Sequence, residues 1–304
     1  MENCMMIGEL AALGAALCWT ISAALYKTAL AKASPLPANT IRCLGTSIFM
    51  LLCLTIAGHA GVFLSLSSYA VLLASASGLV GLGFGDTLYL KSLRILGVSR
   101  AVPLTCTYPL FSLVWALFLV GEDVTLQVVL AAITIVAGIW LLSWERSSAS
   151  NMAEKQRKML AKGVTFAILT AAVWSISISM INLALRENMD LEHAFAINTL
   201  RVAVLAIFLP IFTCITEGKS GFYKIDKETA AILISGGIIA IGLGWVLLTL
   251  SFTYIPESQA VPISSTTPLF SALFSVIFLK EKVTLRIAFG SVLVVAGTLL
   301  IFMI

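Results

Sequence analysis

Asp86 is the residue with the clearest chemical potential in this sequence, because it is the single charged side chain in the apolar stretch of residues 69–90. Tyr89 follows it about one helical turn later. An ionised group in apolar surroundings is costly, so such an acid normally has a partner or a role. Three interpretations are open: a structural ion pair with Arg42, an acid that binds substrate or couples protons, and a charge that reaches a polar surface.

Aromatic and hydroxyl side chains share one face of a predicted helix near the start of the chain. Trp19, Ser22 and Tyr26 follow the i, i+3, i+7 spacing that places side chains on a single helical face. Part of this pattern recurs later in the chain, at Trp174 and Ser177, and Asn182 lies nearby. These groups could stack on a metabolite and form hydrogen bonds with it, or they could pack helices together with their polar atoms satisfied.

Two arginines occur in nearly the same local context. Arg42 ends the tetrapeptide NTIR, and Arg201 ends the tetrapeptide NTLR. A guanidinium recognises carboxylates and phosphates well, so both arginines are candidates for binding such a group at the mouth of a cavity. The alternative is that each side chain extends to a membrane surface and anchors its helix there.

An unusual proline-containing segment occurs twice, as VPLTCTYPLFS at residues 102–112 and as VPISSTTPLFS at residues 261–271. Each copy has two prolines, which remove backbone donors and leave carbonyl groups free within a helix. The residues between the prolines include Thr105, Cys106, Thr107 and Tyr108 in the first copy and Ser264, Ser265, Thr266 and Thr267 in the second. We expect a loosened helix whose polar groups line a site; the alternative is that the hydroxyls only satisfy the free carbonyls.

Small residues form a stripe on another pair of predicted helices. Gly78, Gly81 and Gly85 are spaced along one helix, and the later stripe consists of Gly237, Ala240 and Gly244. Small side chains let two backbones approach closely within a membrane. We therefore expect both stripes to be packing surfaces between helices.

The elements that carry these residues are expected to be membrane helices. Of the 304 residues, 60% are hydrophobic and 11% are charged, whereas soluble domains have about 25% charged residues. Because lipid offers the backbone no hydrogen bonds, each apolar stretch long enough to cross the membrane should be a helix. We count ten such stretches, approximately at residues 7–26, 41–58, 69–90, 98–120, 126–144, 161–185, 195–215, 229–250, 259–279 and 285–304.

Aligning the sequence with itself shows an internal repeat of two copies. An offset of 155 residues aligns Trp19 with Trp174. After an insertion in the second copy, an offset of 159 residues aligns Arg42 with Arg201 and brings the two proline segments together. At the same offset the counterpart of Asp86 is Trp245, so any role of this acid is asymmetric.

Each copy holds five predicted helices, and an odd number makes the second copy enter the membrane from the opposite side. We predict an all-α membrane protein of ten transmembrane helices, with inverted repeats at residues 1–144 and 161–304, a basic linker at residues 145–160 and a central cavity. The candidate cavity residues are Trp19, Ser22, Tyr26, Arg42, Asp86, Tyr89, Thr105, Tyr108, Trp174, Ser177, Asn182, Arg201, Trp245, Ser264 and Thr267.

The paired tryptophans, arginines and proline segments are followed in each copy by a closing motif, GEDVT at residues 121–125 and KEKVT at residues 280–284. In this order they resemble the EamA-type unit of the drug/metabolite transporter superfamily, and the resemblance covers nearly the whole chain. It implies a ten-helix fold around a central cavity and movement of small polar or amphipathic metabolites, often outward. It also implies that both termini lie inside the cell.

The distribution of positive charge predicts the opposite orientation. All but two of the 19 lysines and arginines lie near alternate predicted loops, the exceptions being Arg186 and Arg201. Loops rich in lysine and arginine stay in the cytoplasm. The charge bias therefore predicts that both termini are extracytoplasmic.

Together these features predict a secondary active transporter in the cell membrane that moves small metabolites, such as amino acids or related compounds, by alternating access. Protons are a candidate coupling ion, and the lipid bilayer is the surrounding medium. No cofactor, metal or nucleic-acid partner is expected, because the cysteines lack CxxC spacing and no phosphate-binding loop occurs. The alternatives are a membrane receptor or scaffold and an intramembrane enzyme, although the predicted spans contain no GxSxG motif, HExxH motif or acid pair.

Overall fold

The computed structural model describes residues 2–143, 154–218, 225–278 and 285–302. Within these ranges every regular element is helical and no strand occurs. Among the described residues, seven helices are long and apolar enough to cross a membrane, and two shorter apolar stretches lie at Leu126–Leu141 and Phe289–Ile301. The described part of the chain is thus all-helical, and the chain has the composition of a multi-pass membrane protein, as predicted.

The helices follow the chain in the same general order in both halves. The first half contains α1 (Glu2–Ala29), α2 (Pro35–Ile56), η1 (Ala60–Leu64), α3 (Ser68–Ser77), η2 (Gly78–Gly85), α4 (Asp86–Leu96), α5 (Val98–Thr105), α6 (Tyr108–Trp115), η3 (Ala116–Val120) and α7 (Leu126–Ser143). The second half contains α8 (Glu154–Leu185), α9 (Leu191–Thr216), α11 (Lys227–Gly237), η5 (Ile238–Gly244), α12 (Trp245–Ser251), α13 (Glu257–Ser264), α14 (Thr267–Phe278) and α15 (Leu285–Phe302).

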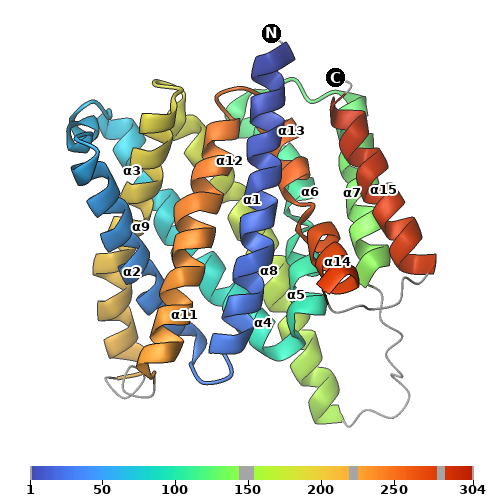
Figure 1. The fold of residues 1–304 in the computed structure, drawn as a ribbon, viewed down its shortest axis with the longest axis horizontal. Coiled ribbons are helices and arrows are strands. Elements are labelled where there is room, and N and C mark those ends of the chain that lie inside the picture. The colour runs from blue at the N-terminus through green and yellow to red at the C-terminus, as the bar shows by residue number, and fades with distance from the viewer. Residues whose placement is uncertain (1, 144–153, 219–224, 279–284, 303–304) are drawn as a thin grey trace.

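The first helix of each half packs against the interrupted third helix of the other half. Helix α1 contacts α11, η5 and α12, and α8 contacts α3, η2 and α4. Helices α2 and α9 pack together on one side of the molecule and α7 and α15 on the other, while both chain ends lie at the same end of the bundle (Figure 1). Helices α1 and α8 therefore carry their polar faces into the middle of the bundle.

The glycine stripes are close packing surfaces, as predicted. A Cβ atom built on Gly78 would lie 2.5 Å from the carbonyl oxygen of Arg201, and one on Gly237 would lie 2.9 Å from the carbonyl oxygen of Arg42. The first stripe lies within η2, and the second runs from the end of α11 into η5; η2 and η5 are both π-helical and occupy corresponding places in the two halves. Glycine is needed here because two backbones pass without room for a side chain.

The prolines divide each segment into two short helices, as the sequence predicted. The first break lies between α5 and α6, where Pro109 occupies the first turn of α6, a position at which a missing donor costs little. The second lies between α13 and α14. Near the breaks, Thr105 donates to the carbonyl of Val102 at 2.9 Å and Ser264 to that of Val261 at 2.9 Å. Both carbonyls also accept from a backbone N–H group, that of Cys106 at 2.8 Å and that of Ser265 at 3.1 Å, so these hydroxyl bonds add to backbone bonds and do not replace lost ones.

Parts of two predicted motifs lie outside the described residues. Residues 144–153 of the predicted linker region belong to this part of the chain, as does the motif KEKVT at 280–284. Helix α8 begins at Glu154, so the last residues of the predicted linker are helical.

Candidate functional site

A cavity lies at the centre of the bundle, between the two halves. Its lining consists of Trp19, Ser22, Tyr26, Arg42, Asp86, Tyr89, Val102, Thr105, Cys106, Tyr108, Trp174, Ile178, Ala240, Ile241, Trp245 and Thr267. The cavity volume is about 50 Å³, and one water molecule needs about 10–15 Å³. The cavity therefore has room for a few waters, and its walls must move apart to admit a metabolite.

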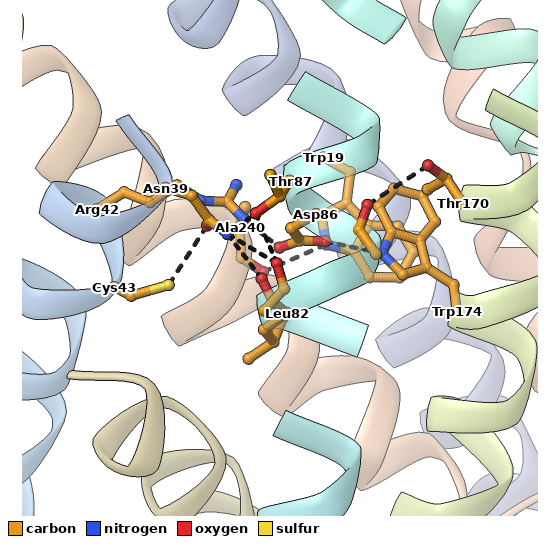
Figure 2. A network of polar contacts seen from close by, with 12 residues as sticks. Trp19, Asn39, Arg42, Cys43, Leu82, Asp86, Thr87, Thr170, Trp174 and Ala240 are labelled. Carbon is orange, nitrogen blue, oxygen red and sulfur yellow. Dashed lines mark hydrogen bonds and ion pairs between the residues drawn. The ribbon is translucent and has the colours of Figure 1, made fainter. Parts of the chain in front are cut away.

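Arg42 and Asp86 form a buried ion pair at the wall of this cavity (Figure 2). Arg42 is 2% exposed and Asp86 is 3% exposed, so neither side chain reaches a surface. The second carboxylate oxygen of Asp86 accepts a hydrogen bond from Trp174 Nε1 at 2.7 Å. Of the three interpretations of Asp86, the structural ion pair is therefore present and the surface charge is wrong. Surface anchoring by Arg42 is wrong for the same reason.

Asn39 fixes the guanidinium of this pair from the other side. Its Oδ1 atom accepts from Arg42 Nε at 2.8 Å, while its Nδ2 atom donates to the carbonyl of Leu82 at 2.9 Å and to Thr87 Oγ1 at 3.0 Å (Figure 2). Because Leu82 lies in the π-helical η2, this asparagine ties the arginine to a segment with irregular backbone hydrogen bonding. The network joins α2, η2, α4 and α8 around one charge pair.

Tyr26 lines the cavity and has a buried hydroxyl group. Its ring lies under the guanidinium carbon of Arg42, which is 4.9 Å from the ring centroid. Its hydroxyl is buried and has no hydrogen-bond partner among the described residues. A buried hydroxyl without a partner is costly, so this group is suited to bond with water or a bound solute.

Arg201 is the sequence counterpart of Arg42, but its surroundings differ. It is fully buried, and it donates to Ser77 Oγ at 3.0 Å, Asn198 Oδ1 at 2.6 Å and Ser177 Oγ at 3.4 Å. Its guanidinium carbon lies 4.5 Å from the centroid of the Trp245 ring, and that ring lines the cavity. Surface anchoring is therefore wrong for this arginine as well.

The two proline breaks meet across the cavity. Tyr108, at the start of α6, and Ser264, at the end of α13, share a hydrogen bond of 2.8 Å. Thr105 and Thr267 line the cavity beside them, and the Tyr108 ring lies edge-on to Trp174 with centroids 6.3 Å apart. The wall is thus built from both halves, at the points where their helices are interrupted.

A second buried polar cluster lies at the start of α13, and of its members only Asn182 was indicated by the sequence pattern. Glu257 is fully buried; it accepts from Ser179 Oγ at 2.6 Å and Asn182 Nδ2 at 3.0 Å. Glu122 accepts from the backbone N–H groups of Glu257 and Ser258, each at 2.9 Å, and from Asn182 at 3.3 Å. Both acids lie just outside the predicted spans, and only their long-range contacts reveal that they meet and that Glu257 is buried.

Most of the predicted site residues are brought together, and some are not. Ser177, Asn182, Arg201 and Ser264 lie outside the cavity lining, behind it or in the Glu257 cluster. The lining residues that the sequence analysis did not select as cavity candidates are Val102, Cys106, Ile178, Ala240 and Ile241. Four of these have aliphatic side chains and carry no chemical signal, although Ile178 follows Trp174 by four residues and so shares its helical face.

Comparison with known proteins gives matches along the whole chain. The model of the EamA-like transporter family matches twice, at residues 6–144 and 161–303. An uncharacterised transporter of Archaeoglobus fulgidus is 26% identical over 302 residues, which cover 98% of this chain and 99% of the relative. A Lactobacillus johnsonii protein whose name refers to ribose uptake is 24% identical and covers 91% of each chain.

Two further matches are more limited in what they show. Mouse solute carrier family 35 member G1 is 26% identical over 149 residues, which cover 49% of this chain and 38% of the mouse protein. A solved crystal structure aligns over 96% of this chain and 95% of its own with a TM-score of 0.72. At 17% identity, this last match supports the fold alone.

Proposed function

We propose, from the premise that this chain belongs to the EamA-like transporter family, that it carries a small metabolite across a membrane by alternating access. The family and the names of the relatives show more generally that the chain is a membrane transporter of small solutes. In transporters built from two repeats, alternating access is largely a rocking of one half against the other around a site between them. The proposal therefore depends on how the halves are related.

Reciprocal contacts support two halves related by a two-fold axis. Gly85 packs on Trp174, and its counterpart Gly244 packs on the counterpart Trp19. Likewise, Gly78 packs on the backbone of Arg201, and its counterpart Gly237 packs on the backbone of the counterpart Arg42. If each half crosses the membrane five times, with the two proline-broken segments counted as spans, this axis lies in the membrane plane and the halves are inverted.

The single observation that carries the proposal is the central cavity, whose wall contains the interrupted helices of both halves. Breaks in membrane helices are tolerated where the backbone faces protein or a polar cavity, and they supply points at which short helices can tilt. Thr105 and Tyr108 come from the first half, and Thr267 and Trp245 from the second. Tilting of either half would enlarge the cavity toward one end.

The lining favours a small solute that has both hydroxyl groups and an apolar face. Six aromatic rings, including that of Tyr26, line the cavity and could stack on a ring-shaped solute. Several hydroxyl groups line it beside them. Ribose is the first solute to test, because the name of one relative refers to its uptake. Amino acids and related compounds, which the sequence analysis favours, form the second test set, with protons as the candidate coupling ion.

Uptake into vesicles tests this function directly. Purified protein reconstituted into liposomes should accumulate radiolabelled ribose or a labelled amino acid faster than empty liposomes, and imposing a pH gradient shows whether protons drive it. Trp245→Leu should lower the rate at least about tenfold, because it removes a cavity wall. The matched control is Phe118→Leu, since Phe118 is 75% exposed on the outer surface. Equal rates for both variants would contradict the assignment of the cavity as the transport site.

A further inference from the structure

The two equivalent arginines differ in how their charges are balanced. Arg42 has the carboxylate of Asp86 as an ion-pair partner. Arg201 has none among the described residues: its hydrogen bonds go to the hydroxyls of Ser77 and Ser177 and to the amide of Asn198. The difference follows from the sequence, because the position that holds Asp86 in the first half holds Trp245 in the second, and an aromatic face replaces the carboxylate.

The region around the cavity therefore contains two buried positive charges and one buried negative charge. The other buried acids of the described residues are Glu9 and Glu257, and neither lines the cavity. Glu257 bonds to Ser179 and Asn182 in a separate cluster. An uncompensated charge in a low-dielectric interior is costly, and an incoming opposite charge reduces that cost.

The excess charge is placed to act on a solute in the cavity. Trp245 lines the cavity, and its ring separates the cavity from the guanidinium of Arg201. The guanidinium carbon lies 4.5 Å from the centroid of that ring. Tyr26 also lines the cavity; its hydroxyl lacks a partner among the described residues and can donate to an anionic oxygen. One group supplies the charge and the other a hydrogen bond.

We propose that the transported solute carries a carboxylate or phosphate group, and that the unbalanced charge of Arg201 gives the cavity its preference for anions. This inference rests on the proposed transport function and names the substrate class of the same cavity. Arg201 acts from behind Trp245, so it is a positioning and selectivity residue and does not touch the solute. Asp86 lowers the net positive charge around the cavity, because its carboxylate neutralises Arg42.

Collisional quenching of tryptophan fluorescence measures the charge of the cavity and does not require that the substrate be identified. Trp19, Trp174 and Trp245 line the cavity, so the other tryptophans, at positions 115, 140 and 144, are replaced by phenylalanine. Neutral acrylamide reports whether solutes enter, and iodide and caesium report the sign of the charge. We expect iodide to quench at least about threefold more strongly than caesium, since like-charged ions are repelled from a charged cavity.

Two substitutions with opposite expected effects make the test specific. Arg201→Gln should bring iodide and caesium quenching to near equality, and Arg201→Lys should keep the difference. Asp86→Asn should increase the preference for iodide, because it leaves Arg42 unbalanced as well. Ribose 5-phosphate should reduce iodide quenching at concentrations at least about tenfold lower than ribose, the matched neutral probe.

The outcomes separate this inference from the proposed function. Quenching by acrylamide with equal effects of iodide and caesium, or with an iodide preference that Arg201→Gln leaves unchanged, overturns the anion inference and leaves a transport cavity in place. Stronger competition by ribose than by ribose 5-phosphate also overturns it. Failure of acrylamide to quench means that solutes do not reach the cavity, which contradicts both proposals.

Discussion

Asp86 has both carboxylate oxygens occupied, one by Arg42 and the other by Trp174. This arrangement explains why an acid is tolerated in an apolar stretch: each oxygen meets a donor from a different helix. It also makes the residue a link between the first and second halves, since Trp174 belongs to α8. The acid is therefore expected to affect stability as well as any role in transport.

The ion pair gives a prediction about coupled substitutions. Asp86→Leu should lower the free energy of unfolding by about 3–5 kcal/mol, because it leaves the Arg42 charge buried without its partner. The double substitution Arg42→Met with Asp86→Leu should be less destabilising than Asp86→Leu alone, since both charges are then absent. Thermal unfolding of detergent-purified variants measures both values. A double variant less stable than the single one would show that the pair does not compensate in this way.

At the scale of elements, the π-helical segments η2 and η5 bring the third helix of each half against the second helix of the other. Gly78, the first residue of η2, lies against the backbone of Arg201, and Gly237, the last residue of α11 before η5, lies against the backbone of Arg42. A π-helical turn widens the backbone and disturbs the regular hydrogen bonding, and such turns are frequent at functional sites. Here both segments directly precede the residues that line the cavity, Asp86 and Trp245.

Substitution of the glycines tests this close approach. Gly78→Ala should destabilise the protein by about 1–3 kcal/mol, because its Cβ would lie 2.5 Å from a backbone oxygen that cannot move easily. Gly242→Ala is the matched control in η5, where the nearest atom to a built Cβ is 3.8 Å away. The control should unfold at the wild-type temperature or slightly above it. Similar losses in the two variants would indicate a general requirement for glycine in these segments instead of a close contact.

Helix α13 offers a second prediction at this scale, because Glu122 caps its first turn through two backbone N–H groups. Glu122→Ala should cost about 0.5–2 kcal/mol of stability, as expected for the loss of a helix cap. Asp123→Ala provides the control, since it removes the same charge from an exposed neighbour. Thermal unfolding compares the two, and an equal effect would mean that charge, and not capping, is responsible.

For the whole molecule, the main asymmetry is between its two ends. The connections between α1 and α2 and between α4 and α5, together with the starts of α8 and α11, lie at the end opposite both termini (Figure 1). Lys32 illustrates the basic end, where it pairs with Asp226 at 3.3 Å. Arg42 and Arg201 are buried in the bundle and so do not belong to the loops at either end. Leaving them out removes one arginine from the count for each end, and most of the positive charge still lies at the basic end.

The charge bias predicts the orientation in the cell. A reporter fused to either terminus should lie outside the cytoplasm, because the basic connections are retained inside. Alkaline phosphatase fused at the C-terminus should therefore be active in a bacterial host, and green fluorescent protein at the same place should be dark. A fluorescent and phosphatase-inactive pair of fusions would favour the orientation that the family resemblance implies.

The amino-acid sequence alone was sufficient to predict those properties that depend on neighbouring residues or on self-similarity. The apolar stretches predict helices and the paired proline segments predict broken helices, and the described residues have both. The spacing of Trp19, Ser22 and Tyr26 predicts that they share one helical face, and all three lie in the lining of the cavity. Each signal is local, or is repeated at a fixed offset, so it can be found before the packing is known.

Only the tertiary structure decided which polar groups have partners. Glu257 stands at a helix start in the sequence, yet it is fully buried because α8 brings Ser179 and Asn182 to it. Arg42 and Arg201 have nearly the same local sequence, yet one meets a carboxylate and the other an indole ring. The free energy of a buried charge depends on atoms contributed by distant helices, and local sequence does not specify which helices these are.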